Sequence, residues 1–184
     1  MSSDDTNILS VSESYGATSI LRSEKLAQDT TPTNPVIEEF ISQLSLSSDD
    51  IIILLQPTSP LRKPHHIVEA LKQFMGADHC DSLISVTSGD SKYFYSFVIH
   101  NEFLQPITEK FSNIPRRQEL PEIYLPNGAI YMFNVGKFLT EKTIPKKNVL
   151  AYIMENDVSL DIDTVEDLAQ AEKYLTQQGS EIHD

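Results

Sequence analysis

The sequence predicts an α/β fold in which helices cover a mostly parallel sheet. Residues 51–55 are five consecutive branched aliphatic residues, a run too short for a surface helix and typical of a strand buried on both faces. Apolar residues recur at helical spacing on either side of this run, over residues 35–46 and 64–75, and a further apolar strand is expected over 82–86. This alternation of strand and helix favours parallel strands joined by helical crossovers.

The other elements follow from the same periodicities. A turn is expected at Asn127-Gly128, because this dipeptide is a common turn signal. The polar stretch 23–35 fits either a ligand-binding loop or plain surface. We expect helices over residues 2–15, 135–140 and 164–178, a short strand over 17–21, and strands over 129–134 and 149–154.

Composition and charge exclude several classes of protein. A chain of 184 residues is long enough for one sizeable domain, and its formal net charge of −13, with 14 scattered basic residues, argues against nucleic acid as a partner. No apolar stretch reaches the length of a membrane span, and the N-terminal residues do not form a secretory signal. Cys80 is the only cysteine, which excludes an internal disulfide framework and fits a cytoplasmic protein. An acidic chain needs local positive charge or a metal ion to handle an anionic ligand.

A β-hairpin with bulky residues on both faces is expected after the second apolar strand. Bulky side chains stand on both alternating faces of residues 93–99, and a turn at 100–102 follows. Phe103, Leu104 and Ile107 come after the turn. Two strands cannot shelter such residues by themselves. Our hypothesis is that this arm packs against a second subunit, and the alternative is that it folds onto its own domain.

Hydrogen-bonding side chains gather directly after the strand at 51–55. Gln56-Pro57 ends this strand, because proline has no N–H for the sheet. Residues 58–62 read Thr-Ser-Pro-Leu-Arg and lie at the carboxyl end of a strand, where open α/β sheets bind ligands. The sequence therefore predicts either a ligand-binding turn or an ordinary loop after a strand.

Arg116 and Arg117 are the only two adjacent arginines on this acidic chain. They lie in an irregular, proline-containing stretch. Arginine can hold a carboxylate or a phosphate through two parallel hydrogen bonds. The pair is therefore a candidate anion site, and the alternative is a solvated surface pair.

Asp161 and Asp163 are the clearest candidates for metal chemistry. If residues 160–163 are extended, both carboxylates lie on one face, because side chains alternate along a strand. Two carboxylates this close suit Mg²⁺ bound to a phosphate-bearing substrate. The alternative is a helix cap, in which Asp163 is the N-cap and Glu166 completes a capping box. A cap would explain Asp163 but not Asp161.

Four stretches of the chain share the order and the spacing of one family's motifs. They are Leu55-Gln56-Pro57-Thr58-Ser59-Pro60-Leu61-Arg62, Arg117-Gln118-Glu119-Leu120-Pro121, Asn127-Gly128-Ala129-Ile130-Tyr131 and Asp161-Ile162-Asp163-Thr164. Together they resemble the acylneuraminate cytidylyltransferase family, the enzymes that make CMP-sialic acid and related CMP-activated nine-carbon sugars. The resemblance covers essentially the whole chain.

The resemblance implies a three-layer, Rossmann-like nucleotidyltransferase fold with a mostly parallel central sheet and a protruding β-hairpin dimerisation arm. It places the α/β core in residues 1–90 and 127–184, and the dimerisation arm with a sugar-binding insert in residues 91–126. The implied reaction is attack by the anomeric hydroxyl of a 2-keto sugar acid on the α-phosphate of CTP, with loss of pyrophosphate. The implied partners are CTP, the sugar acid and a second copy of the chain docked through residues 91–110, with no nucleic acid and no membrane.

The resemblance also implies roles for individual residues. The catalytic residues would be Asp161, Asp163 and Gln56, and the two aspartates would bind the cofactor, Mg²⁺. The substrate-binding residues would be Arg22 and Thr33 at the cytidine, Gln56, Thr58 and Ser59 in the sugar pocket, and Arg117 at the sugar carboxylate, with Asn127 and Tyr131 nearby.

One departure from the family pattern bears on the expected activity. Members open with a strand and a basic, glycine-containing loop that wraps the CTP phosphates, and here the resemblance begins after that loop. We therefore expect an N-terminally truncated chain that lacks the nucleotide-binding loop. Two alternatives stay open beside an enzyme for a sialic-acid-like sugar. One is an inactive remnant acting as a binding or assembly subunit, and the other is a cytidylyltransferase for pseudaminic, legionaminic or 3-deoxy-octulosonic acid.

Overall fold

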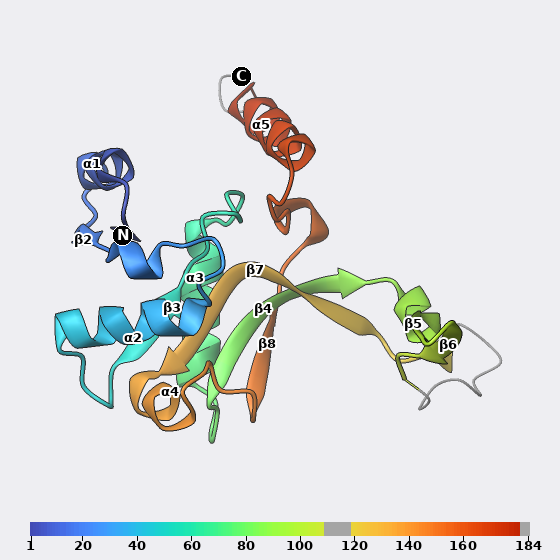
Figure 1. Ribbon diagram of the computed structural model, residues 1–184. Helices are drawn as coiled ribbons and strands as arrows, with labels where there is room; N and C mark the ends of the chain where they lie inside the picture. Colours follow the sequence, from blue (N-terminus) through green and yellow to red (C-terminus); the bar gives the residue numbers. More distant parts are fainter. Residues whose placement is uncertain (109–118, 181–184) are drawn as a thin grey trace. The chain divides into compact units, whose positions relative to one another are not determined.

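The computed structural model describes residues 1–108 and 119–180 (Figure 1). The chain forms two compact units. The first unit contains Met1–Ile52 and Phe133–Lys147, and the second contains Ile53–Met132 and Asn148–Asp184. The combination of helices and strands confirms the α/β class. Within the described ranges, no helix has both the length and the apolar content that crossing a membrane requires. The expected division into a core and an arm stays a prediction.

The first unit begins with a short strand rather than with the expected helix. β1 (Ser2–Ser3) pairs in parallel with β2 (Ile20–Leu21), so the helix expected over residues 2–15 is shortened to α1 (Thr6–Ser14). Asp5 is the N-cap of α1, because its carboxylate accepts backbone N–H groups of the first turn. The other helices of this unit are η1 (Glu24–Leu26), α2 (Thr33–Leu44) and α4 (Val135–Glu141).

The larger sheet has the strand order β3-β7-β4-β8. Its strands are β3 (Ile51–Leu54), β4 (Ser82–Gly89), β7 (Ile123–Asn134) and β8 (Val149–Ile153). β4 and β8 are parallel, in a register that runs from Ser82 opposite Val149 to Val86 opposite Ile153. The strand expected at 51–55 is confirmed as β3, which lies at one end of this order. That the sheet is mostly parallel stays a prediction.

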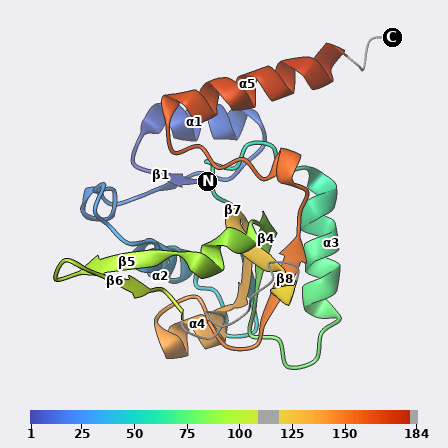
Figure 2. The ribbon, with the colours of Figure 1, turned by 90° about the vertical axis from the view of Figure 1, so that its right-hand side faces the viewer.

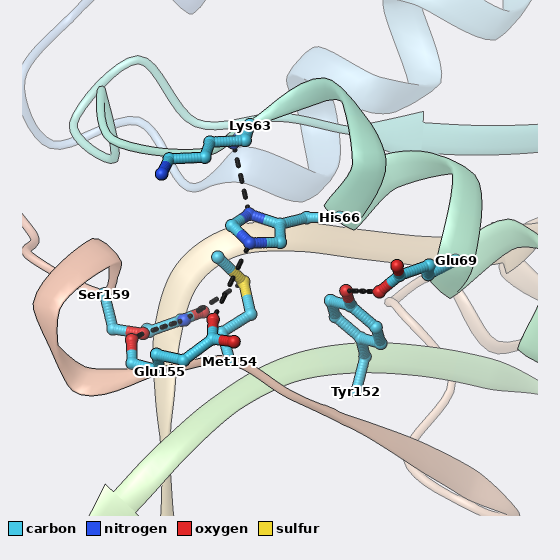
Figure 3. Close-up of polar contacts among 8 residues, drawn as sticks. Lys63, His66, Glu69, Tyr152, Met154, Glu155 and Ser159 are labelled. Atoms are coloured by element: carbon cyan, nitrogen blue, oxygen red, sulfur yellow. Dashed lines mark hydrogen bonds and ion pairs between the residues drawn. The ribbon is translucent and has the colours of Figure 1, made fainter. Parts of the chain in front are cut away.

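Helix α3 (Pro64–Met75) contacts β4 and β8 in the second unit, and Figure 2 shows it beside β8. Pro64 stands in the first turn of the helix, where the N–H that proline lacks would have no helical partner. The Phe74 side chain is buried. Tyr152 of β8 donates its hydroxyl to Glu69 Oε2 of α3 at 2.7 Å (Figure 3). Gln73 Nε2 of the helix also donates to the carbonyl of Ala151 in β8 at 3.1 Å. Apolar packing and these polar bonds therefore fix the helix to the sheet.

His66 closes the first turn of α3 with a buried imidazole. Its Nδ1 accepts the backbone N–H of Lys63 at 3.1 Å (Figure 3). Because Nδ1 is an acceptor, the neutral ring carries its proton on Nε2, which lies 3.7 Å from Glu155 Oε2. Burial lowers the pKa of His66, and the neighbouring His65 lowers it further, so the neutral ring is favoured.

The turn expected at Asn127-Gly128 is wrong, because β7 continues through both residues. Gly128 has a φ of +73°, the left-handed backbone that makes Asn-Gly a turn signal. Here the same backbone produces an irregularity inside a strand, as in bulges that contain glycine. Asn127 compensates for the disturbed pairing, because its Oδ1 accepts the N–H of Ala129 at 3.3 Å. The strand expected at 129–134 is therefore the second half of a longer one.

The antiparallel hairpin expected after β4 is present. β5 (Phe97–His100) pairs with β6 (Phe103–Pro106). Asn101 and Glu102 connect the two strands with φ angles of 49° and 69°, as a two-residue turn of type I′ requires. The aromatic residues ahead of β5 form η2 (Ser91–Tyr95) rather than the beginning of the strand.

Helix α5 (Val165–Ser180) is capped by Thr164 and Asp167, so the expected cap by Asp163 and Glu166 is wrong. Thr164 Oγ1 accepts the N–H of Asp167 at 3.2 Å, and Asp167 Oδ2 accepts the N–H of Thr164 at 2.9 Å. These reciprocal bonds form a capping box that begins one residue later than expected. The carboxylate of Asp163 therefore has no role in the cap.

This cap predicts a contribution to stability that depends on pH. Hydrogen bonds donated by Thr164 hold the pKa of Asp167 below its usual value. The ionised carboxylate therefore stabilises the fold above the unfolded pKa of about 4, and this contribution is lost as the pH falls through the lower folded pKa. Asp167→Asn should lower the melting temperature at neutral pH, and the difference from the wild type should shrink as the pH falls below about 4. Thermal unfolding followed by circular dichroism at several pH values measures it.

Asp163→Asn is the matched control for this prediction. It removes a charge from the same segment but touches no bond of the cap, so it should change the melting temperature little. Equal losses in the two variants at neutral pH would contradict the assignment of the cap.

Candidate functional site

The turn that follows β3 is held by bonds from two other segments of the second unit. Ser59 is fully buried, and its Oγ donates to the carbonyl of Asn127 in β7 at 3.1 Å. The carbonyl of Thr58 accepts the N–H of Ile162 at 2.8 Å. The Gln-Pro-Thr-Ser turn, the irregular part of β7 and the segment that carries Asp161 therefore meet at one place.

Three polar side chains converge on the Cα of Gly128. A Cβ at this position would lie 2.8 Å from Gln56 Oε1, 3.2 Å from Ser59 Oγ and 3.3 Å from Asp161 Oδ2. Any larger residue would therefore displace them, and the positive φ separately favours glycine. The amide of Gln56, the hydroxyl of Ser59 and the carboxylate of Asp161 are therefore gathered around one point. The first two come from the turn after β3, and the carboxylate comes from a segment far along the chain.

Asp161 supplies the negative charge of this group. Its Oδ1 is buried and accepts no hydrogen bond from the residues that the structure describes, an arrangement that is unfavourable for a carboxylate oxygen. Burial, and then the nearby charge of Asp161, raise the pKa of the Tyr131 hydroxyl. A buried acceptor without a donor is a position where a cation or a ligand hydroxyl would bind favourably.

The oxygens of this segment fit a magnesium ion that is held partly by its substrate. Mg²⁺ prefers hard oxygen ligands and is commonly bound by one or two carboxylates together with substrate phosphates. Asp161 offers an unpaired buried oxygen, and Asp163 has an exposed carboxylate that the helix cap does not use. Within residues 1–108 and 119–180, no group of three His, Cys, Asp or Glu side chains is placed to hold a metal ion alone.

Arg62 is a cation of the same turn to which sequence motifs gave no role. Its Nη1 donates to the carbonyl of Gln56 at 3.3 Å and to that of Ala129 at 2.6 Å. These bonds connect the start of the turn to the residue after Gly128. Burial lowers the pKa of Arg62, but an arginine remains protonated at neutral pH. No sequence signal separates this half-buried arginine from one on the surface.

The predicted site residues are distributed over both units. Those in the second unit are Gln56, Thr58, Ser59, Asn127, Tyr131, Asp161 and Asp163. In the first unit, Arg22 Nη2 donates to the carbonyl of Ser2 at 2.8 Å, and Thr33 is the first residue of α2. Arg117 and its neighbour Arg116 lie outside the described residues.

A cavity of about 340 Å³ borders Asp161 in the second unit. Its lining combines hydroxyl, amide and carboxylate side chains with two leucines, a composition that suits a polyhydroxylated ligand better than an apolar one. η4 (Asn156–Val158) and α5 form part of its wall. The lining residues are Leu61, Asn156, Asp157, Ser159, Leu160, Asp161, Gln170 and Tyr174.

Comparison with solved structures places the fold in a known class. The structure of CMP:2-keto-3-deoxy-manno-octonic acid synthetase complexed with CTP matches with a TM-score of 0.65 and 14% sequence identity. The match covers 96% of this chain and 80% of that one. At this identity the likeness shows the fold alone, which this chain shares with that synthetase. No family model matches the chain.

Sequence relatives then identify the family. A CMP-N,N'-diacetyllegionaminic acid synthase from Legionella pneumophila is 30% identical over 182 residues, which cover 95% of this chain and 76% of that protein. An N-acylneuraminate cytidylyltransferase from Escherichia coli is 34% identical over 173 residues, which cover 89% of this chain. The chain belongs to the acylneuraminate cytidylyltransferase family. It spans 38% of the length of the relatives from E. coli and Streptococcus agalactiae.

The crowding around Gly128 predicts that an added methyl group is costly there. Gly16 is a matched control, because its φ is +84° and nothing lies within 4 Å of the place its Cβ would take. Gly16→Ala should lose about 1–2 kcal/mol of unfolding free energy from the left-handed backbone alone. Gly128→Ala should lose roughly 1–3 kcal/mol more, because the methyl group also overpacks the site. Urea unfolding measures both, and equal losses would show that the three side chains do not converge on Gly128.

Proposed function

We propose that the chain is a cytidylyltransferase that activates a sialic-acid-like nine-carbon sugar acid with CTP, giving the CMP-sugar and pyrophosphate. The observation that carries the proposal is the convergence of Gln56, Ser59 and Asp161 on Gly128. Gln56 and Ser59 belong to one of the four motifs that resemble the family, Gly128 belongs to a second and Asp161 to a third. Sequence motifs and geometry therefore select the same place. The single cysteine supports a cytoplasmic location as part of the proposal.

In the proposed reaction, the anomeric hydroxyl of the sugar acid attacks the α-phosphorus of CTP. A new oxygen–phosphorus bond forms, the bond to the β-phosphate breaks, and pyrophosphate leaves with the bonding electrons. Such a transfer depends on alignment and on neutralisation of charge more than on covalent help from the protein. The protein's own contribution is therefore to orient the sugar and to place charge beside the phosphates.

The turn after β3 orients the sugar in this proposal. Gln56 and Thr58 are half-buried, so their side chains can contact a ligand at the surface of the turn. Ser59 is fully buried and bonded to Asn127, so it supports the turn from beneath rather than contacting the sugar. Arg62 fixes the start of the same turn to β7.

Asp161 and Asp163 are the proposed ligands of Mg²⁺. When bound, the ion would neutralise negative charge on the α-phosphate. Asp161 is fixed in place because the next residue, Ile162, donates its N–H to the Thr58 carbonyl. Asp163 is exposed and free of the helix cap, so its carboxylate is available to a bound ion.

The resemblance supports the remaining assignments. Arg117 would hold the sugar carboxylate through two hydrogen bonds, and Arg22 and Thr33 would contact the cytidine. Tyr131 would lie beside the sugar, which agrees with the effect of Asp161 on its pKa.

The identity of the sugar acid defines the alternatives. Legionaminic, pseudaminic and 3-deoxy-octulosonic acid would undergo the same reaction, and a relative that acts in legionaminic acid activation is 30% identical. A different role, that of a subunit that binds a sugar acid without transferring it, would use the same pocket. Pyrophosphate release separates this role from the enzymatic one.

The proposal predicts magnesium-dependent release of pyrophosphate from CTP in the presence of one sugar acid. Asp161→Asn should lower kcat about 100-fold or more, because a charged ligand of the metal is lost. Its stability should change little. The measurement is a coupled pyrophosphate assay with sialic, legionaminic, pseudaminic and 3-deoxy-octulosonic acids. Asp78→Asn is the matched control, since Asp78 is an exposed aspartate of the second unit outside the candidate site, and its replacement should leave kcat unchanged.

Two outcomes of this assay would contradict the proposal. A folded wild-type protein that binds a sugar acid but releases no pyrophosphate across the panel would instead support the binding subunit. An unchanged kcat in Asp161→Asn would remove Asp161 from the site.

We also propose that the hairpin of β5 and β6 docks on a second copy of the chain to form a homodimer. Ile99 is 76% exposed and Phe103 is 73% exposed. A single hairpin cannot bury such residues, and contiguous exposed apolar side chains are typical of interfaces. The exposed apolar residues of this arm are Tyr93, Tyr95, Phe97, Val98, Ile99, Phe103, Leu104 and Ile107.

The homodimer predicts that a charge on the hairpin favours the monomer. Ile99→Asp should weaken self-association by at least about ten-fold, because an unpaired carboxylate is costly in an apolar interface. Sedimentation velocity over a concentration series measures this. Val11→Asp is the matched control. Val11 of α1 is also exposed, but it belongs to the first unit, whereas the hairpin belongs to the second. A wild-type protein that sediments as a monomer at every concentration would reject the homodimer.

A further inference from the structure

Asn127 joins the segments of the site through a directed chain of hydrogen bonds. On one side, the N–H of Ile130 donates to Ser85 Oγ at 2.7 Å, and Ser85 donates its hydroxyl proton to Asn127 Oδ1 at 2.6 Å. On the other side, Asn127 Nδ2 donates to Ser159 Oγ at 2.9 Å, and Ser159 donates to the carbonyl of Glu155 at 2.7 Å. Figure 3 shows the end of this chain at Ser159 and Glu155.

The direction of the chain requires an amide at its centre. Each serine hydroxyl accepts one bond and donates its single proton, so neither can reverse its role without losing a partner. Asn127 has to accept on one side and donate on the other. A carboxylate cannot donate, and an aliphatic side chain can do neither. Any such replacement leaves a buried polar group unpaired.

The protein uses the whole hydrogen-bonding capacity of this side chain. An asparagine amide has two acceptor positions on oxygen and two N–H donors. The oxygen accepts from Ser85 and from the N–H of Ala129, while the nitrogen donates to Ser159 and to Met154 Sδ at 3.4 Å. Asn127 is 3% exposed. Nothing is left on the amide for a ligand.

The partners of Asn127 lie next to the residues that converge on Gly128. Its backbone carbonyl holds Ser59 in the turn that begins at Gln56, and its amide holds Ser159, two residues before Asp161. Asn127 therefore connects the two segments, because its backbone carbonyl holds the turn and its side-chain amide holds the aspartate segment.

We propose that Asn127 is a positioning residue for the reaction proposed above, and this inference rests on that function. It sets the distance between Gln56 and Asp161 and does not contact the sugar acid, in contrast to the contact that the family resemblance implies. A positioning residue acts on alignment, which appears in kcat, whereas a sugar contact appears in the KM for the sugar.

The test compares Asn127→Asp with Ser85→Ala in steady-state kinetics. Ser85 is buried on β4 and bonded both to the amide of Asn127 and to the N–H of Ile130, so it contacts no ligand and acts on the site through Asn127 and β7. Both variants should lower kcat about 10- to 100-fold, with the KM for the sugar acid within about three-fold of wild type. The double variant Asn127→Asp, Ser85→Ala should be no worse than Asn127→Asp alone, because both changes break one chain of bonds. Ser82→Ala is the matched control, a buried serine on the same strand outside this chain, and should retain the wild-type kcat.

The outcomes separate this inference from the proposed function. A wild-type protein without turnover for any sugar acid overturns the proposed function and this inference with it. An active wild type in which Asn127→Asp raises the sugar KM at an unchanged kcat, or in which the two single losses multiply, overturns the positioning role alone. If Asn127→Asp does not fold, Ser85→Ala against Ser82→Ala decides the same question, because a kcat loss confined to Ser85→Ala supports the role and equal values overturn it.

Discussion

The space above the Cα of Gly128 is the constraint on which the proposed site depends. Gln56, Ser59 and Asp161 occupy the volume that a Cβ would need, and the left-handed backbone at this residue makes β7 irregular there. An ordinary strand residue would restore regular pairing and would push the three groups apart. The site therefore exists because one strand of the sheet is irregular at one position.

The polar groups around this point fall into two sets according to their depth below the surface. Ser59, Ser85 and Asn127 are buried and bonded to one another and to the backbone, so they supply rigidity and offer nothing to a ligand. Gln56, Thr58 and Asp161 lie nearer the surface and keep unused capacity, most clearly Asp161 Oδ1. This division explains how a chain with a net charge of −13 could hold an anionic substrate. The attraction would come from a bound cation and from single arginines such as Arg62 rather than from a basic surface.

The sequence predicted the main elements of the fold because their signals are local. The buried aliphatic run became β3, and the stripe at 64–75 became α3 with the same bounds. The two wrong predictions have the same cause, because each local sequence signal is compatible with two different structures. Asn-Gly specifies a positive φ but not whether a strand stops there, and the acidic residues near 163–167 allow two capping boxes that differ by one residue. Distant bonds decided between them.

The site was predictable only as a set of motifs. Family resemblance selected Gln56, Ser59 and Asp161, and the structure brings these three together. It gave no means to separate the buried Ser59 and Asn127 from residues that can touch a ligand, because burial depends on partners 27 to 68 residues away in the chain. Arg62 was missed for the same reason, since its bond to Ala129 spans 67 residues.

His66 makes the first turn of α3 sensitive to acid, which the sequence of the helix does not indicate. The ring accepts the Lys63 N–H on Nδ1, so adding a proton to that nitrogen replaces an attraction between donor and acceptor with a repulsion between two donors. Burial already lowers the pKa of the ring, which means that the unfolded chain takes up this proton more readily than the folded one below about pH 6.5. Acidification therefore weakens the first turn of α3, while the hydroxyl of Tyr152 still anchors the helix at Glu69.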